Sequence, residues 1–573
     1  MLIGIDLGTT NSLVAYFDGQ KACIIPNRLG KNLTPSIISI DDQGIIYVGE
    51  TAKERGMLDP SNTASVFKRG MGTDETYSIG GQTFRAEELS SFVLRSLKED
   101  AEHFLGEPVT EAIISVPAYF NDRQRKATRR AGELAGLKVE RIINEPTAAA
   151  LAHGITKQNS VARLMVVDLG GGTFDVTVLD QHGNLIEIHA IAGDNFLGGE
   201  DFTDVLCSVF LKTNGLELED LTLESLVNIR KCAEICKIGF SSHPISGMSY
   251  TIGDNTYSMA LTAKQYKEEC EDLLIRIKKP IERAIRDASI MIKDLDAVIL
   301  VGGATRMPMV REYVSELLGL EISSGLHPDE AVVVGAAIQC GMKQRDEAIR
   351  EIILTEVCPF TLGTEVARVI GDYKERGHYL PIIERNTVIP VSRTETLYTL
   401  DDNQTFVRVK ILQGESRLSW NNLTLGELVI PVPPKKAGEV PILVTYTYDV
   451  NSLLEVVVKV SETGEEKKII IQQTDNPMSD AEVQQRLEEL SYLKINPRDQ
   501  EENKLVIFRG ERLYEETFGD KRQSIGEWLF KFDQAMRKQN REEIESVRKD
   551  FSSFLDDIES SDDSSYFEAE DKE

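Results

Sequence analysis

Hydrophobic residues in the first 347 positions follow two alternating patterns. Short runs rich in Val and Ile, such as 298–301, have the length and composition of buried strands, and longer stretches with helical spacing separate them. Strands that alternate with helices are typical of an α/β fold. The pattern therefore predicts an α/β domain over residues 1–347.

Two pairs of segments in this region resemble each other. Residues 3–15 read IGIDLGTTNSLVA and 166–178 read VVDLGGGTFDVTV, so each combines a strand, an acidic Gly-rich turn and a second strand. A second pair, 145–154 and 328–339, is helical in pattern and rich in small residues. The order hairpin, helix, hairpin, helix predicts a duplicated domain with two lobes.

The pattern changes near residue 348. A short apolar segment within 348–357 is expected to form an interdomain linker. Residues 358–475 contain almost only strand patterns, for example the alternation at 407–412. We therefore expect an antiparallel β-sandwich after the linker.

The period becomes helical again over 476–560. Capping boxes that begin at Ser479 and Ser524 predict two helix starts, and apolar stripes predict a helical lid. The last segment, 561–573, is strongly acidic and is expected to be a solvated tail. The sequence thus predicts a multidomain protein.

Composition narrows the functions that this architecture can have. The 573-residue chain has a formal net charge of −29, which repels nucleic-acid phosphates and anionic lipids, so neither nucleic acid nor a membrane is an expected partner. The first residues lack a basic leader, and no apolar run reaches the roughly 18 residues of a membrane span. Seven scattered cysteines without a CxxC pair fit a reducing compartment. We expect a cytoplasmic monomer.

The two Gly-rich turns carry the first candidate chemistry. Tight glycine turns let backbone N–H groups approach an anion, and threonine hydroxyls add donors, so 8–11 and 170–173 are candidate phosphate-binding loops. Asp6 and Asp168 precede the turns at matching positions, where opposed hairpins would place both carboxylates near a Mg²⁺ that keeps most of its waters. Two unrelated turns with incidental aspartates are the alternative, which the matched repeat disfavours.

A third strand and turn adds a candidate site for a nucleotide base. The apolar run 298–301 ends in Gly302 and Gly303, and Arg306 follows. A flat glycine surface beside an arginine suits a purine and its ribose, although a plain βα turn has the same pattern. The P-loop sequence GxxxxGK[ST] does not occur, so a nucleotide site here belongs to another class.

Ten short motifs along the chain form one set: IGIDLGTTNS (3–12), VPAYFND (116–122), INEPTAAAL (143–151), DLGGGTFDV (168–176), GDNFLGGEDF (193–202), VGGATRMP (301–308), LGTE (362–365), RNTVIP (385–390), DDNQ (401–404) and LQGE (412–415). In their order and spacing they resemble the DnaK-type heat-shock chaperone family, the seventy-kilodalton class, and this resemblance extends to about residue 475. NLTPSIIS (32–39) and SSFVLRSLKEDAE (90–102) are most similar to the bacterial HscC branch.

The resemblance implies an actin-like (ribonuclease H-like) ATPase domain that holds ATP or ADP with Mg²⁺, and K⁺ is a further candidate cation. In that family, positioned groups supply most of the catalysis of phosphoryl transfer. Asp6 and Asp168 would hold the metal through water. The implied catalytic residues are Lys68, which would orient the attacking water, Glu145, Asp168, Thr173 and Thr10. The implied nucleotide-binding residues are Thr9, Thr10, Asn11, Gly170, Gly171, Gly172, Thr173, Glu234, Lys237, Ser241, Gly302, Gly303 and Arg306.

The resemblance also implies peptide binding and coupling. The sandwich shows no catalytic grouping, and it would bind extended apolar peptides beneath a helical lid. ATP and peptide would then change each other's affinity by linkage. The implied coupling residues are Pro117, Arg125, Ile352, Ile353 and Leu354. The implied peptide-binding residues are Thr364, Val366, Leu397, Leu400, Val407 and Val409. For each peptide-binding residue, an ordinary position in the core of the sandwich is the alternative.

Three departures from the family pattern leave details open. Thr355 and Glu356 replace the usual leucine and aspartate of the linker, and the hairpin at 366–385 is longer than usual. The segment between Lys68 and Pro117 is shorter than in well-known members. Unfolded polypeptides and a J-domain co-chaperone are the expected partners. The shorter segment trims one upper lobe, so a nucleotide-exchange factor is an expected partner only if its binding does not need the missing part.

The main hypothesis is an ATP-dependent chaperone. A divergent holdase or exchange-factor-like member with weak coupling is the first alternative. A small-molecule kinase of the same fold would need an acceptor pocket and a catalytic Asp base, and a filament-forming protein would lack the regions after residue 347.

Overall fold

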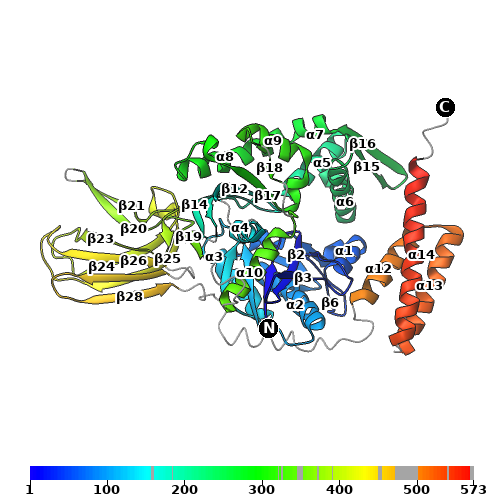
Figure 1. The fold of residues 1–573 in the computed structure, drawn as a ribbon, viewed down its shortest axis with the longest axis horizontal. Helices are drawn as coiled ribbons and strands as arrows, with labels where there is room; N and C mark the ends of the chain where they lie inside the picture. Colours follow the sequence, from blue (N-terminus) through cyan, green and yellow to red (C-terminus); the bar gives the residue numbers. More distant parts are fainter. Residues whose placement is uncertain are drawn as a thin grey trace.

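The computed structural model describes residues 1–156, 161–183, 185–320, 322–323, 327–344, 353–370, 373–389, 391–448, 454–471, 501–538 and 541–567. Figure 1 shows a two-lobed body in the middle, strands at one end and a group of helices at the other. The predicted coupling residue Ile352 and the predicted helix start at Ser479 lie outside the described residues.

Lobe I, residues 1–156, is built on a mixed sheet with the order β11-β10-β1-β2-β3. β1 pairs parallel with β10 and antiparallel with β2, so the first predicted hairpin lies inside the sheet. The elements are β1 (Leu2–Asp6), β2 (Asn11–Phe17), β3 (Ala22–Ile25), β4 (Thr34–Pro35), β5 (Ile37–Ile40), β6 (Ile46–Val48), α1 (Glu50–Leu58), η1 (Pro60–Asn62), β7 (Thr63–Ser65), η2 (Phe67–Gly70), β8 (Thr76–Ile79), β9 (Gln82–Arg85), α2 (Ala86–Leu105), β10 (Glu111–Val116), α3 (Asp122–Leu134), β11 (Lys138–Asn144) and α4 (Glu145–Thr156).

Lobe II, residues 161–323, repeats this arrangement. Its sheet has the order β18-β17-β12-β13-β14, and β12 pairs antiparallel with β13 and parallel with β17. The elements are β12 (Val161–Leu169), β13 (Phe174–His182), β14 (Leu185–Asp194), α5 (Gly199–Asn214), η3 (Leu218–Asp220), α6 (Leu223–Gly239), β15 (Ile245–Ile252), β16 (Asn255–Thr262), α7 (Ala263–Glu269), α8 (Glu271–Asp287), η4 (Ile292–Asp294), β17 (Ala297–Val301), η5 (Gly303–Arg306), α9 (Pro308–Leu318) and β18 (Ile322–Ser323).

Helices α4 and α10 (Ala331–Gln344) are rich in small residues because they pack closely against each other. Helix α10 also packs against β1 and β2 of lobe I, and α4 packs against β12 and β13 of lobe II. A Cβ on Gly335 would lie 1.8 Å from the carbonyl oxygen of Ala148, and one on Gly4 would lie 2.5 Å from the backbone nitrogen of Ala337. Only glycine permits these approaches. The small-residue segments predicted at 145–154 and 328–339 therefore join the two lobes.

Strand β19 (Ile353–Val357) extends the sheet of lobe II. It pairs parallel with β14, Ile353 opposite Leu185, and antiparallel with β22 (Val388–Ile389). The segment predicted as a linker therefore connects lobe II to the strands that follow through backbone hydrogen bonds.

The strands that follow form two packed sheets, with the orders β21-β20-β24-β25 and β23-β26-β27-β28. Alternate residues of β26 are buried, and residues of both sheets, such as Ile411 and Val456, share one core, as in a β-sandwich. The elements are β20 (Leu362–Ile370), β21 (Tyr373–Ile383), β23 (Val391–Tyr398), β24 (Phe406–Gln413), η7 (Ser419–Asn421), β25 (Leu423–Pro431), β26 (Pro441–Tyr448), β27 (Leu454–Val460) and β28 (Glu466–Ile471).

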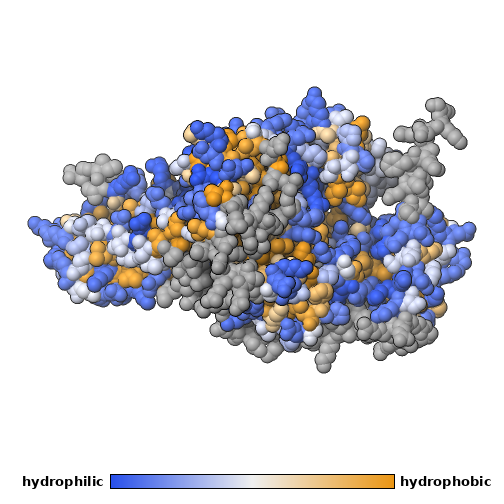
Figure 2. All heavy atoms as spheres, in the orientation of Figure 1, coloured by the Kyte–Doolittle hydropathy of each residue, from blue (hydrophilic) through white to orange (hydrophobic). Residues whose placement is uncertain are grey.

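The helical end consists of α12 (Glu501–Glu516), α13 (Gly519–Lys538) and α14 (Arg541–Phe567) around a core that includes Phe532 and Phe551. α13 begins before Ser524, which the capping box marks as a helix start, and α14 continues beyond residue 561. Figure 2 shows a largely hydrophilic surface on this end. None of the described helices is both long and apolar enough to cross a membrane.

Candidate active site

Two glycine turns meet between the lobes. The turn after β1 and the turn after β12 approach so closely that a Cβ on Gly171 would lie 1.9 Å from Thr10 Oγ1, and one on Gly172 would lie 2.7 Å from Thr9 Cγ2. A Cβ on Gly8 would lie 1.9 Å from the carbonyl oxygen of Asn11. Glycine is therefore required on both sides of the junction.

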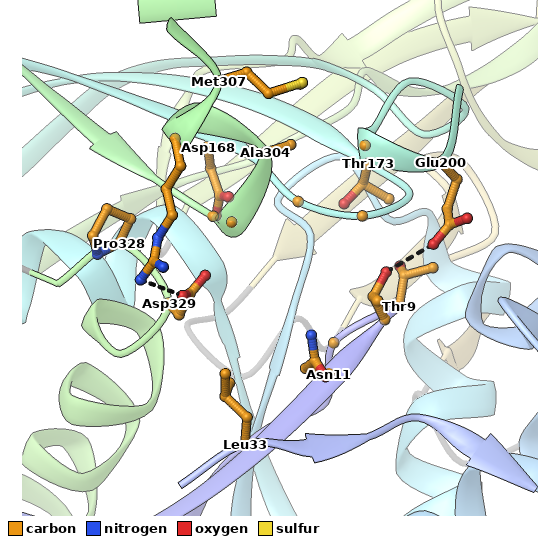
Figure 3. Close-up of a pocket in the computed structure, with 18 of the residues that line it drawn as sticks. Thr9, Asn11, Leu33, Asp168, Thr173, Glu200, Ala304, Met307, Pro328 and Asp329 are labelled. Atoms are coloured by element: carbon orange, nitrogen blue, oxygen red, sulfur yellow. Dashed lines mark hydrogen bonds and ion pairs between the residues drawn. The ribbon is translucent and has the colours of Figure 1, made fainter. Parts of the chain in front are cut away.

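A cavity of about 550 Å³ opens beside this junction, between the two lobes. Figure 3 shows threonines and Asp168 pointing into it from several elements. The predicted site residues that line it are Asp6, Thr9, Thr10, Asn11, Lys68, Glu145, Asp168, Gly170, Gly171, Thr173, Glu234, Lys237, Ser241, Gly302, Gly303 and Arg306. The structure thus brings together residues that are up to 300 positions apart, since Asp6 and Arg306 face one cavity.

Buried carboxylates and one lysine occupy the inner wall of the cavity. Lys68 Nζ lies 2.7 Å from Glu145 Oε1, and the Lys68 side chain is only 4% exposed. Asp6 Oδ1 accepts a hydrogen bond of 2.7 Å from Ser115 Oγ. Burial, with the neighbouring Glu145 carboxylate as the next cause, raises the pKa of Asp6 to about 7 and raises the pKa of Asp168 well above its usual range.

Asp175 is a fourth buried acid, which interacts with Glu145 but is not one of the residues that line the cavity. Burial, followed by Glu145, raises the pKa of Asp175 to about 7, although its carboxylate accepts hydrogen bonds from the backbone N–H groups of Ala118 and Tyr119. Burial is the main cause of all three upward shifts, so the site disfavours ionised carboxylates that have no cation beside them.

The residues of the wall fit a hydrated magnesium ion. Asp168 Oδ2 is buried, and among the described residues no hydrogen-bond partner reaches it. No group of three or more His, Cys, Asp or Glu side chains in the described ranges is arranged to ligate a metal directly. Mg²⁺ favours oxygen ligands and usually keeps several waters, so Asp6 and Asp168 are suitable water-mediated partners.

The outer part of the cavity suits a nucleoside. Lys237 Nζ lies 2.6 Å from Glu234 Oε2 and donates to the carbonyl oxygen of Gly199 over 2.9 Å. On the opposite side, Arg306 pairs with Asp329 over 2.6 Å. Gly302 has a φ of 84°, and a Cβ there would lie 2.4 Å from the carbonyl oxygen of Leu169. A glycine surface between two charged pairs therefore faces the space for a base and ribose.

Arg125 connects this wall to the loop after β10. Its guanidinium donates to the carbonyl oxygens of Phe120 and Ala118 over 2.9 and 3.0 Å and to Asn144 Oδ1 over 2.7 Å. Asn144 directly precedes Glu145, and the loop itself begins at Pro117. The two coupling residues predicted in lobe I thus lie behind the carboxylates.

The same loop reaches the sandwich. The ring of Tyr119 lies 4.7 Å from that of Phe360, centroid to centroid, and Arg283 of α8 donates to the Tyr119 hydroxyl over 2.9 Å. Nearby, Asn386 Oδ1 accepts the backbone N–H of Ile191 in β14 over 3.1 Å. Lobe I, lobe II and the sandwich therefore meet around Tyr119.

The predicted peptide-binding residues divide into two groups. Thr364 and Val409 are 0% and 1% exposed, and the Thr364 hydroxyl donates to the carbonyl oxygen of Lys410, so both lie inside the sandwich. Val366, Leu397, Leu400 and Val407 are partly exposed. Of the predicted linker residues, Leu354 packs against the core between the lobes.

Sequence reasoning missed Arg69, Asp175, Glu200 and Asp201. Thr10 Oγ1 donates to Glu200 Oε1 over 3.2 Å, and Arg69 pairs with Asp201 over 2.5 Å, so both pairs cross between the lobes. Asp175, Glu200 and Asp201 lie within motifs quoted above, and Arg69 follows Lys68 directly. Their positions within or next to these motifs could have identified them as site residues. The residues with which they pair could not be predicted, because the pairs depend on the fold.

One protein-family model matches nearly the whole chain. The model described as Hsp70 protein matches residues 2–571.

Proposed function

The chain belongs to the Hsp70 family of ATP-dependent chaperones, and we propose that it hydrolyses ATP in the cavity between its lobes to switch the affinity of its sandwich for extended apolar peptides. One observation carries this proposal. Strand β19 is hydrogen-bonded both to β14 of lobe II and to β22, which leads into the sandwich. A change in the lobes therefore acts on the sandwich through a continuous sheet.

ATP would lie with its phosphates between the two glycine turns. Backbone N–H groups of both turns and the hydroxyls of Thr10 and Thr173 would bind the phosphate oxygens. Lys68, held by Glu145 over 2.7 Å, would orient the attacking water and stabilise charge on the γ-phosphate. Mg²⁺, when bound near Asp6 and Asp168, would neutralise part of the phosphate charge.

Helix α12 holds the helical end away from the sandwich. Phe508 packs edge-on against Tyr47 with centroids 5.2 Å apart, and Arg512 pairs with Glu54 of α1 over 3.0 Å. Figure 1 shows the helical end and the sandwich on opposite sides of the lobes. In this arrangement the described helices α12, α13 and α14 do not cover the sandwich, as the ATP-bound form of the proposed cycle requires.

Exposed ion pairs bridge the long hairpin β20–β21 to the loop between β23 and β24. Lys374 Nζ lies 2.9 Å from Asp401 Oδ1 and donates to the carbonyl oxygen of Leu400 over 2.6 Å, and Arg376 lies 3.2 Å from Asp401 Oδ2. The proposed groove residues Val366 and Leu400 lie in the two bridged segments. We infer that the bridge helps to retain a bound peptide.

Asp401→Asn is therefore expected to speed peptide dissociation by about twofold to fivefold, because exposed ion pairs contribute about 0.2–1 kcal/mol. Stopped-flow fluorescence of a labelled peptide measures this rate. Glu427→Gln, which removes the exposed pair with Arg408 in the same sandwich, is the matched control. Equal rates for the two variants would contradict this role of the bridge.

Glu356 makes the docking of β19 dependent on pH. Burial raises the pKa of Glu356 from its usual 4.5, although Arg141 and Arg125 oppose the shift. Because the docked carboxyl binds its proton more tightly than a free one, docking is strongest below the usual value and weakens as pH rises through the docked pKa. Protease cleavage of the linker should increase with pH in this range, and Glu356→Gln should flatten the profile. An unchanged slope in the variant would refute this assignment.

Equilibrium peptide binding tests the proposed function. A labelled extended apolar peptide should bind about tenfold or more tightly with Mg·ADP than with Mg·ATP, within the usual range of coupling between two sites. Equal affinities in the two nucleotides would contradict the switch. A J-domain co-chaperone is the partner proposed to stimulate hydrolysis, in keeping with the family.

A further inference from the structure

Two carbonyl groups of the turn after β12 are held by the start of α5. The backbone N–H groups of Gly199 and Glu200, at the start of α5, donate to the carbonyl oxygens of Gly170 and Gly171 over 2.9 Å each. Both anchors belong to lobe II, like the turn itself. They fix the direction of these two carbonyl groups independently of lobe I.

The third carbonyl depends on lobe I. Arg69 Nε, from η2, donates to the carbonyl oxygen of Gly172 over 3.1 Å. This carbonyl and the N–H of Thr173 belong to one planar trans peptide unit and point in opposite directions. Holding the carbonyl of Gly172 therefore aims the N–H of Thr173 the other way.

Asp201 fixes the guanidinium that makes this contact. Asp201 Oδ2 lies 2.5 Å from Arg69 Nη2 and also accepts the backbone N–H of Gly198 over 2.7 Å. The side chains of Arg69 and Asp201 are only 21% and 19% exposed. The pair thus joins η2 of lobe I to the first turn of α5 at a site that is largely shielded from water.

The backbone before η2 supports a special role for this segment. Val66 has a φ of 59°, in the left-handed region that β-branched residues rarely adopt. Strained backbone persists where the surrounding structure requires it, often at functional sites. Here it precedes Lys68, which lines the cavity, and Arg69, which contacts lobe II.

We propose that Arg69 is a positioning residue for ATP hydrolysis: when the lobes close, it orients the Gly172–Thr173 peptide so that the N–H of Thr173 faces the γ-phosphate. This inference rests on the proposed ATPase function. On this proposal, the N–H groups of the phosphate-binding turn in lobe II are all oriented toward the phosphate only when the cleft is closed. Cleft closure therefore places the water-orienting lysine and the phosphate donor in one movement.

Single-turnover hydrolysis and nucleotide affinity of Arg69→Lys, Asp201→Asn and the double variant test this role. Lysine keeps the charge but cannot hold a carbonyl and a carboxylate in one planar fork. The single-turnover rate of Arg69→Lys should fall about tenfold to a hundredfold, somewhat less than for loss of a direct donor. ADP affinity should stay within about threefold, because ADP lacks the γ-phosphate. The double variant should be no slower than Arg69→Lys, because the two residues act as one unit.

Arg276→Lys is the matched control. Arg276 also holds one carboxylate and one carbonyl, those of Asp194 and Phe196, but all three residues lie in lobe II. This variant should hydrolyse ATP at the wild-type rate. Thermal unfolding with Mg·ADP identifies variants that are merely unstable.

Equal rates for Arg69→Lys and Arg276→Lys would overturn the inference and leave the ATPase proposal standing. Additive losses in the double variant, or equal losses of ADP affinity and rate, would show a general structural role and overturn it as well. A wild-type protein without hydrolysis would overturn the proposed function itself.

Discussion

Lys68→Ala is expected to slow single-turnover ATP hydrolysis about a hundredfold or more, while ATP affinity changes by less than about tenfold. Lys68 Nζ lies 2.7 Å from Glu145 on a wall that also carries Asp6 and Asp168. Its charge acts mainly on the transferring phosphate and the attacking water. Quenched-flow hydrolysis and equilibrium nucleotide binding measure the two quantities.

Removing Lys68 also leaves buried carboxylates without their cation, which destabilises the folded protein. Thr173→Ala is the second variant, because it removes one hydroxyl and no charge, and it should slow hydrolysis with little change in unfolding temperature. Lys98→Ala is the control, since Lys98 donates to the carbonyl oxygen of Gly136 away from the cavity. Hydrolysis by Lys68→Ala within about threefold of the control would refute the assigned role.

Arg385→Ala is expected to reduce the ATP-induced loss of peptide affinity about tenfold. Arg385 of the sandwich pairs with Asp287 of α8 over 2.9 Å and with Glu415 over 2.7 Å. Hydrogen bonds to charged groups contribute about 1.5–3 kcal/mol. Glu415 lies in the sandwich itself, so only the pair between Arg385 and Asp287 requires the sandwich to be docked on lobe II. Its loss therefore weakens the docked state that ATP is proposed to favour.

The measurement is peptide affinity in Mg·ATP and in Mg·ADP for each variant. Arg408→Ala is the control, because Arg408 pairs with Glu427 within the sandwich. The Arg385 variant should keep its ADP-state affinity and lose its ATP response. An ATP response equal to that of Arg408→Ala would show that these contacts do not carry the coupling.

Local patterns were sufficient to predict the two hairpins that hold the site. The alternation at 407–412 lies within β24, which pairs antiparallel with β25. Both Gly-rich turns were predicted because strand, acid and glycine are neighbours in the sequence. The start of α13 was missed, since residues 519–523 are polar and carry no apolar period.

Contacts between distant segments could not be predicted in the same way. The pairing of β19 with β14 and the Arg69–Asp201 pair depend on how the lobes and the sandwich pack. The resemblance to a family named Lys68 as a site residue, whereas composition and spacing alone left it a surface cation. Membership of the Hsp70 family is shown, and similarity to the HscC branch remains a prediction.

Single-turnover ATP hydrolysis with and without an extended apolar peptide, together with release of that peptide on addition of ATP, tests the central claim most directly. Peptide should accelerate hydrolysis, and ATP should release bound peptide, because one sheet joins lobe II to the sandwich through β19. Hydrolysis that ignores peptide, with no release by ATP, would contradict the proposed coupling.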